Sequence, residues 1–341
     1  MKRVFAVILA LTVFLCAASF AEERVDSLTY AVFSYLPDPG YYQELIERRW
    51  AETEPDIRLI RAEWDCYTGE PPEGIDVIMY DAVMLDSLVA AGWIQPIALQ
   101  EVHDPEGIFP FALNGLTVEG RLYGIPVFLC GSFLIYNQRC EAAAAAAHLT
   151  DLAGLPECLV INSENAMNRP QYLIEVIADT QGAANPSADG SPEGALQLID
   201  SLAIGAHKRD EDSQVAMAYD AGAGLGYIGF SESMRLLESR AEATRIKSVS
   251  FSDRPDIHRL YVDAVAVAKG VQGQRYEKCL QLINVMADAE VLTALSVHSG
   301  APQYLLLARK SAYRSLSEAF PLYVQLEALA GAEDNHVILT P

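Results

Sequence analysis

The chain has few basic residues for its length of 341. Its 24 lysines and arginines are set against 46 aspartates and glutamates, which gives a formal net charge of −22. An acidic surface repels phosphate backbones and anionic lipid, so neither nucleic acid nor a membrane surface is an expected partner. It attracts cationic small molecules, although acidity also serves solubility and does not by itself select a substrate.

The chain also lacks the spacings that hold metals or phosphates. Its histidines form no i, i+4 pair and its cysteines have no zinc-ligand spacing, so we expect no metal and no other cofactor. The glycines at 222, 224 and 226 miss the GxGxxG pattern, and no Lys-Ser/Thr follows them. They indicate close backbone approach instead of nucleotide binding.

Long apolar runs are absent beyond the N-terminus. The charged start Met1-Lys2-Arg3 leads into an apolar stretch over residues 4–18, which closes with Ser19-Phe20-Ala21. This pattern predicts a signal peptide over residues 1–21, cleaved after Ala21. The run is short for a membrane anchor, and the bulky Leu15 before Cys16 disfavours a lipoprotein. We expect an exported chain, periplasmic or extracellular, that is not inserted in a membrane.

The roughly 320 residues left after cleavage suit two domains better than one. Strands are expected at 28–33, 57–64 and 75–80, with helices at 41–53 and 82–91. This alternation is typical of a doubly wound α/β lobe, in which ligands lie outside the carboxyl ends of the strands. Tyr35 and Asp81 both follow such ends.

An apolar, β-rich run over residues 123–137 predicts a crossing between two lobes, where ligands are commonly bound. Glu119-Gly120 before it has the form of a two-residue hairpin loop, and the alanines at 142–147 after it favour a helix. Cys130 interrupts the run and is the best single lead to function. We assign lobe 1 to residues 22–131 plus 261–302, and lobe 2 to 132–260 plus 303–341.

The second half of the chain supplies further expected elements. They are a strand at 158–162, helices at 169–180 and 192–203, a strand at 260–268 returning to lobe 1, a helix at 276–287 and C-terminal helices from 303. Ser231 is expected to cap a helix, which would place Glu232 in its first turn.

Four residues are candidates for chemistry, and each has a plain structural alternative. An unpaired cysteine such as Cys130 is most often a small core residue, but in a cleft its thiolate could be a nucleophile if a base or dipole lowers its pKa. Glu232 could interact favourably with the positive end of the helix dipole, or it could be a general base. Asp81 and Asp263 each interrupt an apolar strand edge, so each caps backbone amides or meets a ligand. Cys140 and Cys158 could form a disulfide.

Several segments together resemble thiaminase I, an enzyme built on the periplasmic solute-binding-protein fold. The resemblance extends over most of the mature chain. It is carried by the crossing hairpin and strand, by the cysteine, by the Ser-Glu pair and by the two strand-end aspartates in matching order. The segments are Glu119-Gly120-Arg121-Leu122-Tyr123-Gly124-Ile125-Pro126-Val127-Phe128-Leu129-Cys130, Phe133-Leu134-Ile135-Tyr136-Asn137, Gly229-Phe230-Ser231-Glu232 and Tyr35-Leu36-Pro37-Asp38.

The resemblance implies a two-lobed α/β fold, each lobe a mostly parallel sheet flanked by helices, with the ligand cleft between the lobes. It also implies a transferase that replaces the thiazole of thiamin with another nucleophilic base. Cys130 would match the nucleophile that adds to C6 of the pyrimidine, and Glu232 the acid/base. Asp81 and Asp263 would match pyrimidine-binding carboxylates. The candidate cleft aromatics are Tyr35, Tyr80, Tyr227, Phe230 and Tyr261.

Phe230 stands where the family pattern has tyrosine, and Phe33 occupies a second such position. The loss of a hydroxyl keeps a stacking face but removes a hydrogen bond, which affects substrate preference more than reaction type. The alternative is a non-catalytic solute-binding protein for thiamin, a related pyrimidine or another solute. A papain-type hydrolase is disfavoured because no Cys-Gly-Ser-Cys-Trp-like segment is present. We expect a monomer.

Overall fold

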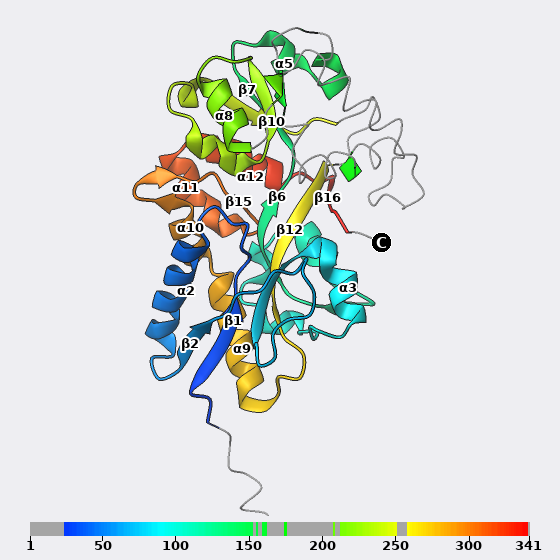
Figure 1. Ribbon diagram of the computed structural model, residues 1–341, viewed down its shortest axis with the longest axis vertical. Helices are drawn as coiled ribbons and strands as arrows, with labels where there is room; N and C mark the ends of the chain where they lie inside the picture. Colours follow the sequence, from blue (N-terminus) through cyan, green and yellow to red (C-terminus); the bar gives the residue numbers. More distant parts are fainter. Residues whose placement is uncertain are drawn as a thin grey trace, which may run out of the picture.

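The structure, a computed structural model, describes residues 24–152, 155, 159–161, 174–175, 207–208, 212–250 and 258–339 (Figure 1). The expected signal peptide and the helix at 192–203 lie outside the described residues, as does the helix at 169–180 apart from residues 174–175. Among the described helices, none is long and apolar enough to span a membrane.

The larger of two main sheets has seven strands in the order β15-β6-β12-β3-β1-β2, with β16 paired to β12. In chain order the strands are β1 (Ser27–Ala31), β2 (Arg58–Arg61), β3 (Val77–Asp81), β6 (Ile125–Cys130), β12 (His258–Val267), β15 (Leu306–Leu307) and β16 (Asn335–Val337). The expected strands at 28–33, 75–80 and 260–268 are therefore confirmed as β1, β3 and β12.

The smaller sheet has five strands in the order β11-β7-β10-β8-β9. They are β7 (Phe133–Asn137), β8 (Leu159–Ile161), β9 (His207–Lys208), β10 (Gly226–Gly229) and β11 (Thr244–Lys247). Only Gly131 and Ser132 separate β6 of one sheet from β7 of the other. A Cβ atom on Gly131 would lie 3.0 Å from Leu260 Cδ2 and 3.3 Å from Arg259 O, so this tight connection favours glycine.

Both sheets are mixed, so the expectation of mostly parallel sheets is wrong. β1 runs parallel to β2 and β3, whereas β12 runs antiparallel to β3 and to β6. In the smaller sheet β10 is parallel to β8 and antiparallel to β7. The reason is the path of the chain: β6 leaves the larger sheet for the smaller one and β12 returns, so the two strands run in opposite directions.

Helices surround both sheets, as Figure 1 shows. α2 (Pro39–Thr53) starts at Asp38, whose Oδ1 accepts a hydrogen bond from Tyr41 N at 2.9 Å, and it buries the apolar face expected from its sequence. The other α-helices are α3 (Leu85–Ala90), α4 (Pro110–Gly115), α5 (Glu141–Ala145), α8 (Asp212–Asp220), α9 (Gly273–Met286), α10 (Ala289–Leu295), α11 (Tyr313–Ala319) and α12 (Leu322–Ala330).

Two short hairpins complete the described fold, β4 (Thr117–Val118) with β5 (Arg121–Leu122) and β13 (Val297–His298) with β14 (Ala301–Pro302). The first confirms the expected Glu119-Gly120 loop, in which both residues have positive φ, 51° and 76°. After residue 303, β15 and β16 join the larger sheet while α12 packs against β11 of the smaller one.

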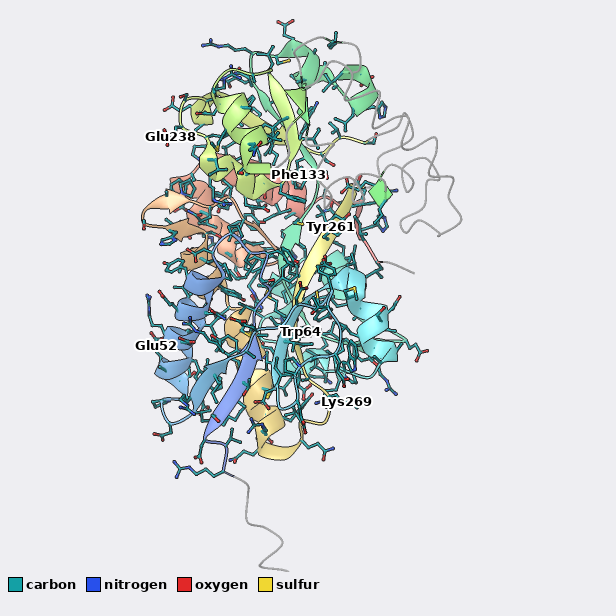
Figure 2. All side chains as sticks on the ribbon, viewed as in Figure 1. Glu52, Trp64, Phe133, Glu238, Tyr261 and Lys269 are labelled. Carbon is teal, nitrogen blue, oxygen red and sulfur yellow. The ribbon has the colours of Figure 1, made fainter. Side chains whose placement is uncertain are left out.

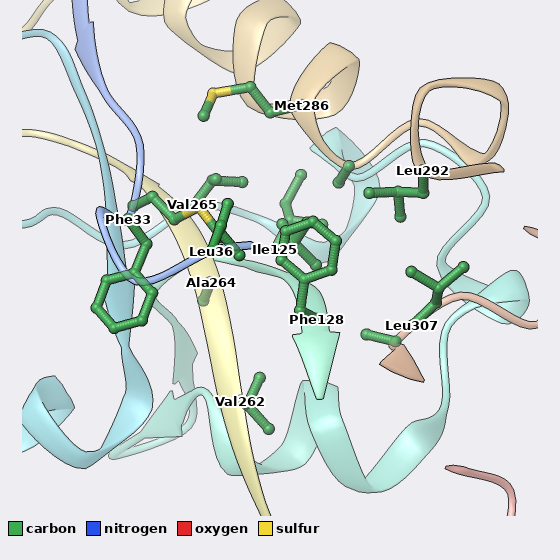
Figure 3. Packing of buried hydrophobic residues seen from close by; sticks show 14 of the residues in the cluster. Phe33, Leu36, Ile125, Phe128, Val262, Ala264, Val265, Met286, Leu292 and Leu307 are labelled. Carbon is green, nitrogen blue, oxygen red and sulfur yellow. The ribbon is translucent and has the colours of Figure 1, made fainter. Parts of the chain in front are cut away.

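The strand β12 lies at the centre of the larger sheet and of its hydrophobic core. Figure 3 shows Val262 and Ala264 of β12 among the buried hydrophobic residues of this core, with Leu307 of β15 in the same view. Val262 is fully buried in this core. Because successive side chains of a strand point to opposite faces, its neighbours Tyr261 and Asp263 face the other side of the sheet.

Candidate functional site

The register of the larger sheet brings four predicted residues onto one face. Asp263 of β12 lies directly opposite Asp81 of β3, and Tyr261 of β12 lies opposite Cys130 of β6. Directly opposed residues of an antiparallel pair share a face, so all four side chains lie together. Figure 2 labels Tyr261 on β12 and Phe133 at the start of β7, in the region where the two sheets meet.

Asp81 ends β3 and forms the N-cap of the following 3-10 turn, η1 (Ala82–Met84). Its Oδ1 accepts a hydrogen bond from Val83 N at 3.0 Å, and its Oδ2 accepts one from Tyr67 Oη at 2.5 Å. Only 7% of the residue is exposed. Burial raises the pKa of Asp81, and the two hydrogen bonds oppose that rise.

Asp263 is half-buried beside Asp81. Burial raises the pKa of Asp263 well above its usual range, and the negative charges of Asp81 and then Glu232 raise it further. Two neighbouring carboxyl groups of this kind titrate as a pair and retain a proton more readily than isolated ones. The pair can therefore present a hydrogen-bond donor and acceptors together.

Cys130 lies at the end of β6, where it is half-buried and not part of a disulfide. Burial raises the pKa of its thiol well above the usual value, and the charges of Glu232, Asp263, Asp81 and Glu175 raise it further. The condition expected for a nucleophile, a lowered pKa, is therefore not met in the free protein. Ionisation of the thiol needs a proton acceptor or a positive charge brought by a ligand.

Glu232 lies in η5 (Ser231–Leu236), a 3-10 helix that follows β10. The expectation that Ser231 caps this element is wrong: the cap position is Phe230, and Ser231 is the first helical residue. The turn is held instead by Ser233, whose Oγ donates to Phe230 O at 2.6 Å and lies 2.9 Å from Tyr227 Oη. Of the charges acting on Cys130, that of Glu232 is the largest.

Aromatic side chains gather in front of Asp81. Tyr35 is 55% exposed and its ring centroid lies 5.2 Å from that of Phe33 and 6.1 Å from that of Tyr67. Its hydroxyl donates to Asp65 Oδ2 at 3.0 Å. Tyr67 was not predicted from the sequence. The signal that singled out Tyr35, an aromatic residue in a turn-rich loop next to a strand, applies equally to the loop holding Tyr67.

Two predicted cleft aromatics are core residues, which corrects the sequence-based prediction. Tyr80 precedes Asp81 in β3 and faces the opposite side, where it is fully buried and its hydroxyl donates to Tyr123 O at 3.3 Å. Tyr227 is fully buried against Tyr219, with ring centroids 5.2 Å apart.

Tyr261 and Phe230 remain candidates for the site. Phe230 is half-buried immediately before η5. Tyr261 is 9% exposed, and its buried hydroxyl has no hydrogen-bond partner among the described residues. The Ser231 hydroxyl, next to Glu232, is likewise unpartnered within the described chain. Unpaired buried hydroxyls are costly, so they are candidate ligand contacts.

The remaining sequence candidates do not add a metal centre or a disulfide. Within the described ranges, no group of three or more histidine, cysteine or acidic side chains is arranged to hold a metal ion. Cys140 is a buried free thiol, and Cys158 lies outside the described residues.

Comparison with known proteins identifies relatives by sequence and by fold. No family model matches the chain. The sequence is 29% identical over 340 residues to Thiaminase-1 of Paenibacillus thiaminolyticus, covering 91% of this chain and 83% of that protein. The structure is similar to that of Clostridium botulinum thiaminase I in complex with thiamin, with a TM-score of 0.85 and 27% identity over 92% of this chain and 94% of the other.

The chain is a homologue of thiaminase I. A second structure, thiaminase I from Bacillus thiaminolyticus, has a TM-score of 0.83 and 28% identity over 92% of this chain and 94% of that one. The fold is also that of solute-binding proteins: a maltodextrin-binding protein from L. casei has a TM-score of 0.66 at 16% identity, covering 94% and 89% of the two chains. The sequence-based resemblance to thiaminase I is thus confirmed.

Proposed function

We propose that this thiaminase I homologue is a transferase that cleaves thiamin by exchanging its thiazole for another nucleophilic base. The observation that carries the proposal is the strand register that sets Cys130, Asp81 and Asp263 on one face of the larger sheet. Glu232 is brought to the same thiol from the smaller sheet's side of the connection. These groups come from separate parts of the chain.

We infer that the two sheets are the cores of two lobes and that substrate binds between them. The short connection at Gly131-Ser132 and the return along β12 support this arrangement. Residues 22–131 plus 261–302 would form lobe 1 and 132–260 plus 303–341 lobe 2, with β15 and β16 reaching across into the larger sheet. The N-terminal segment 1–21 would direct export to a periplasm or to the medium.

The aspartate pair suits the aminopyrimidine ring of thiamin. One carboxyl that retains a proton can donate to a ring nitrogen, while the ionised partner accepts from the exocyclic amine. Hydrogen bonding to the ring nitrogen draws electrons from the ring and makes C6 a better acceptor for a thiolate. The exposed rings of Tyr35 and Tyr67 offer stacking faces for a cationic heteroaromatic ligand.

Glu232 is the group placed to receive the thiol proton. In the proposed reaction the Cys130 thiol transfers its proton to Glu232, and the thiolate forms a bond to C6 of the pyrimidine. The bond between the bridging CH2 and the thiazolium nitrogen then breaks, and its electron pair leaves with the neutral thiazole. A base such as pyridine adds to the CH2 group. Finally the C6–S bond breaks and the proton returns from Glu232, which restores the thiol.

The electrostatics favour ionisation only when substrate is present. The acids around Cys130 oppose a thiolate in the free protein. The positive charge of the thiazolium offsets that negative potential, so the thiol loses its proton more easily in the complex. Free enzyme and complex would therefore differ in thiol reactivity.

Thiamin consumption with and without added pyridine or aniline tests the proposal. The transferase predicts base-dependent loss of thiamin, with release of the thiazole and formation of the exchanged product, followed by chromatography. Saturable thiamin binding without consumption would instead identify a non-catalytic solute-binding protein, which the maltodextrin-binding-protein fold also supports. Neither turnover nor binding would show that this chain acts on a different ligand.

A further inference from the structure

Asp65, in the loop after β2, holds two aromatic residues of the candidate site with a single carboxyl group. Its Oδ2 accepts a hydrogen bond from Tyr35 Oη at 3.0 Å, and its Oδ1 accepts one from Tyr67 N at 3.0 Å. Tyr35 belongs to the loop after β1, so its bond to Asp65 spans 30 residues of sequence. The carboxyl group therefore joins the two loops that carry exposed rings.

The loop that holds Tyr67 is itself closed around Asp65. The backbone O of Asp65 accepts hydrogen bonds from Thr68 N at 3.0 Å and from Thr68 Oγ1 at 2.8 Å. Trp64 Nε1 donates to Gly69 O at 3.1 Å, which joins the two ends of the turn. An aspartate that bonds to the amide two residues further on is a common way to fix such a turn. The backbone position of Tyr67 thus depends on Asp65.

Tyr35 and Tyr67 offer a ligand their ring surfaces, because both hydroxyl groups already donate within the protein. The Tyr35 hydroxyl donates to Asp65, and the Tyr67 hydroxyl donates to Asp81 at 2.5 Å. The two residues are nevertheless 55% and 43% exposed. Their ring centroids lie 5.2 Å and 6.1 Å from that of Phe33. Exposed aromatic surfaces of this kind suit a flat heteroaromatic cation.

We propose that Asp65 is a positioning residue for thiamin binding: it fixes the rings of Tyr35 and Tyr67 relative to each other before the substrate arrives. This inference rests on the proposed function, in which thiamin is the substrate. A side chain that has to be immobilised during binding lowers the affinity. Rings that are already held in the free protein avoid that cost, so the two hydrogen bonds to Asp65 strengthen binding without touching the substrate.

Thiamin affinity, measured by calorimetry in the Cys130→Ser background to prevent turnover, separates positioning from an effect of charge. Asp65→Ala loses both hydrogen bonds and should weaken binding about tenfold, which corresponds to about 1.4 kcal/mol. Asp65→Asn removes the charge but keeps the shape. Its Oδ1 can accept from Tyr67 N while its amide nitrogen donates to Tyr35 Oη, so it should recover most of the loss.

Asp288→Ala is the matched control. Asp288 Oδ1 likewise accepts two hydrogen bonds, from Glu290 N at 2.8 Å and Val291 N at 3.4 Å, but both belong to the start of α10. Its loss should leave the affinity for thiamin unchanged. This control distinguishes the proposed role from a general effect of removing a carboxylate that holds backbone amides.

A measurement without ligand tests the positioning by itself. Hydrogen–deuterium exchange at the Tyr67 amide should be about tenfold faster in Asp65→Ala than in the unchanged chain, because the amide loses its acceptor. In Asp65→Asn the exchange rate should return close to that of the unchanged chain. Unchanged Tyr67 exchange in folded Asp65→Ala would overturn the positioning role whatever the ligand.

Unchanged thiamin affinity in folded Asp65→Ala overturns the proposal, and an equal loss in Asp65→Asn does so too, since it would assign the effect to charge. If Asp65→Ala does not fold, Tyr35→Phe replaces it: this variant removes one of the two hydrogen bonds and should weaken binding about threefold, and unchanged affinity overturns the proposal. Failure of the proposed function is a separate result, because it appears as neither binding nor consumption of thiamin by the unchanged chain.

Discussion

Asp81 and Asp263 form a costly pair, because two carboxyl groups lie opposite each other and the pKa of each is raised by burial. A folded-state pKa above the unfolded value means that the native protein holds a proton which the unfolded chain has already lost. Native stability therefore falls as the pH rises from the usual aspartate range through the raised pKa. The pair therefore lowers the stability of the native protein at a position that the proposed function requires.

Asp263→Asn should raise the melting temperature at pH 8 by about 2–4 °C, because it removes the buried like charge. The gain should shrink towards pH 4, where the wild-type pair is protonated and has lost its repulsion. Thiamin turnover should fall at the same time. Melting curves at both pH values measure the effect, with Asp26→Asn as a matched exposed control. An equal rise in melting temperature at pH 4 and pH 8 would show that charge repulsion within the aspartate pair is not the cause.

Tyr67→Phe should remove the hydroxyl that donates to Asp81 while keeping the ring beside Phe33 and Tyr35. The loss of that donor raises the pKa of Asp81 further, so the acidic limb of the kcat/KM profile should move to higher pH. We expect kcat/KM to fall about tenfold, which corresponds to the free energy of one hydrogen bond to a charged group. Tyr35→Phe is the control, since its hydroxyl donates to Asp65 and the acidic limb should stay in place. A shift of equal size in both variants would argue against a specific role for Tyr67.

At the scale of elements, the site depends on how closely β12 lies to the strands on either side. A Cβ atom on Gly124, just before β6, would lie 2.7 Å from Val265 O of β12. That contact is with backbone and cannot be relieved by a side-chain rotation. The absence of a side chain at Gly124 is thus part of what keeps Cys130 and Tyr261 in register.

Gly124→Ala should therefore destabilise the protein by about 1–3 kcal/mol, the usual cost of overpacking. Gly40→Ala is the control: in α2 its Cβ would meet only Asp38 Oδ1 at 3.7 Å, and alanine favours a helix. Denaturant unfolding of the two variants measures the difference. A Gly124→Ala protein as stable as Gly40→Ala would show that β6 and β12 can separate locally without cost.

The elements that the sequence predicts well are those with a strong local signal. The apolar runs that become β3 and β12, the amphipathic helix α2 and the Glu119-Gly120 turn are examples. Strand direction was missed because the apolar pattern of a strand does not encode which way its neighbour runs. Tyr80 was misplaced for a related reason: β3 is buried on both faces, so its sequence shows no alternation.

In the candidate site, too, the residues with a strong local sequence signal were predicted and those that depend on tertiary contacts were not. Cys130, Glu232, Asp81 and Asp263 were predicted because each is an isolated polar residue in an apolar or glycine-rich setting. Tyr67 was not, since what connects it to the site is a long-range hydrogen bond to Asp81. Such contacts depend on the tertiary fold and leave no periodic mark on the sequence.

For the whole molecule, the net charge of −22 should assist the capture of a cationic substrate. We expect kcat/KM for thiamin to fall about threefold between 20 and 200 mM salt, because screening shortens the reach of the protein's field. Inhibition by the neutral analogue 3-deazathiamin, whose ring lacks the charged nitrogen, should change little over the same range. Equal salt dependence for the two ligands would show that charge steering is unimportant.

The central claim is that Cys130 becomes covalently attached to the pyrimidine of thiamin. Mass spectrometry of Cys130-containing peptides, after incubation with thiamin and no added base, tests it most directly. The account predicts a mass increase equal to the pyrimidinylmethyl group on Cys130. It also predicts loss of this adduct, and of turnover by about 10,000-fold or more, in Cys130→Ser, which should still bind thiamin. Release of thiazole with no adduct on Cys130, or undiminished turnover in Cys130→Ser, would contradict the account.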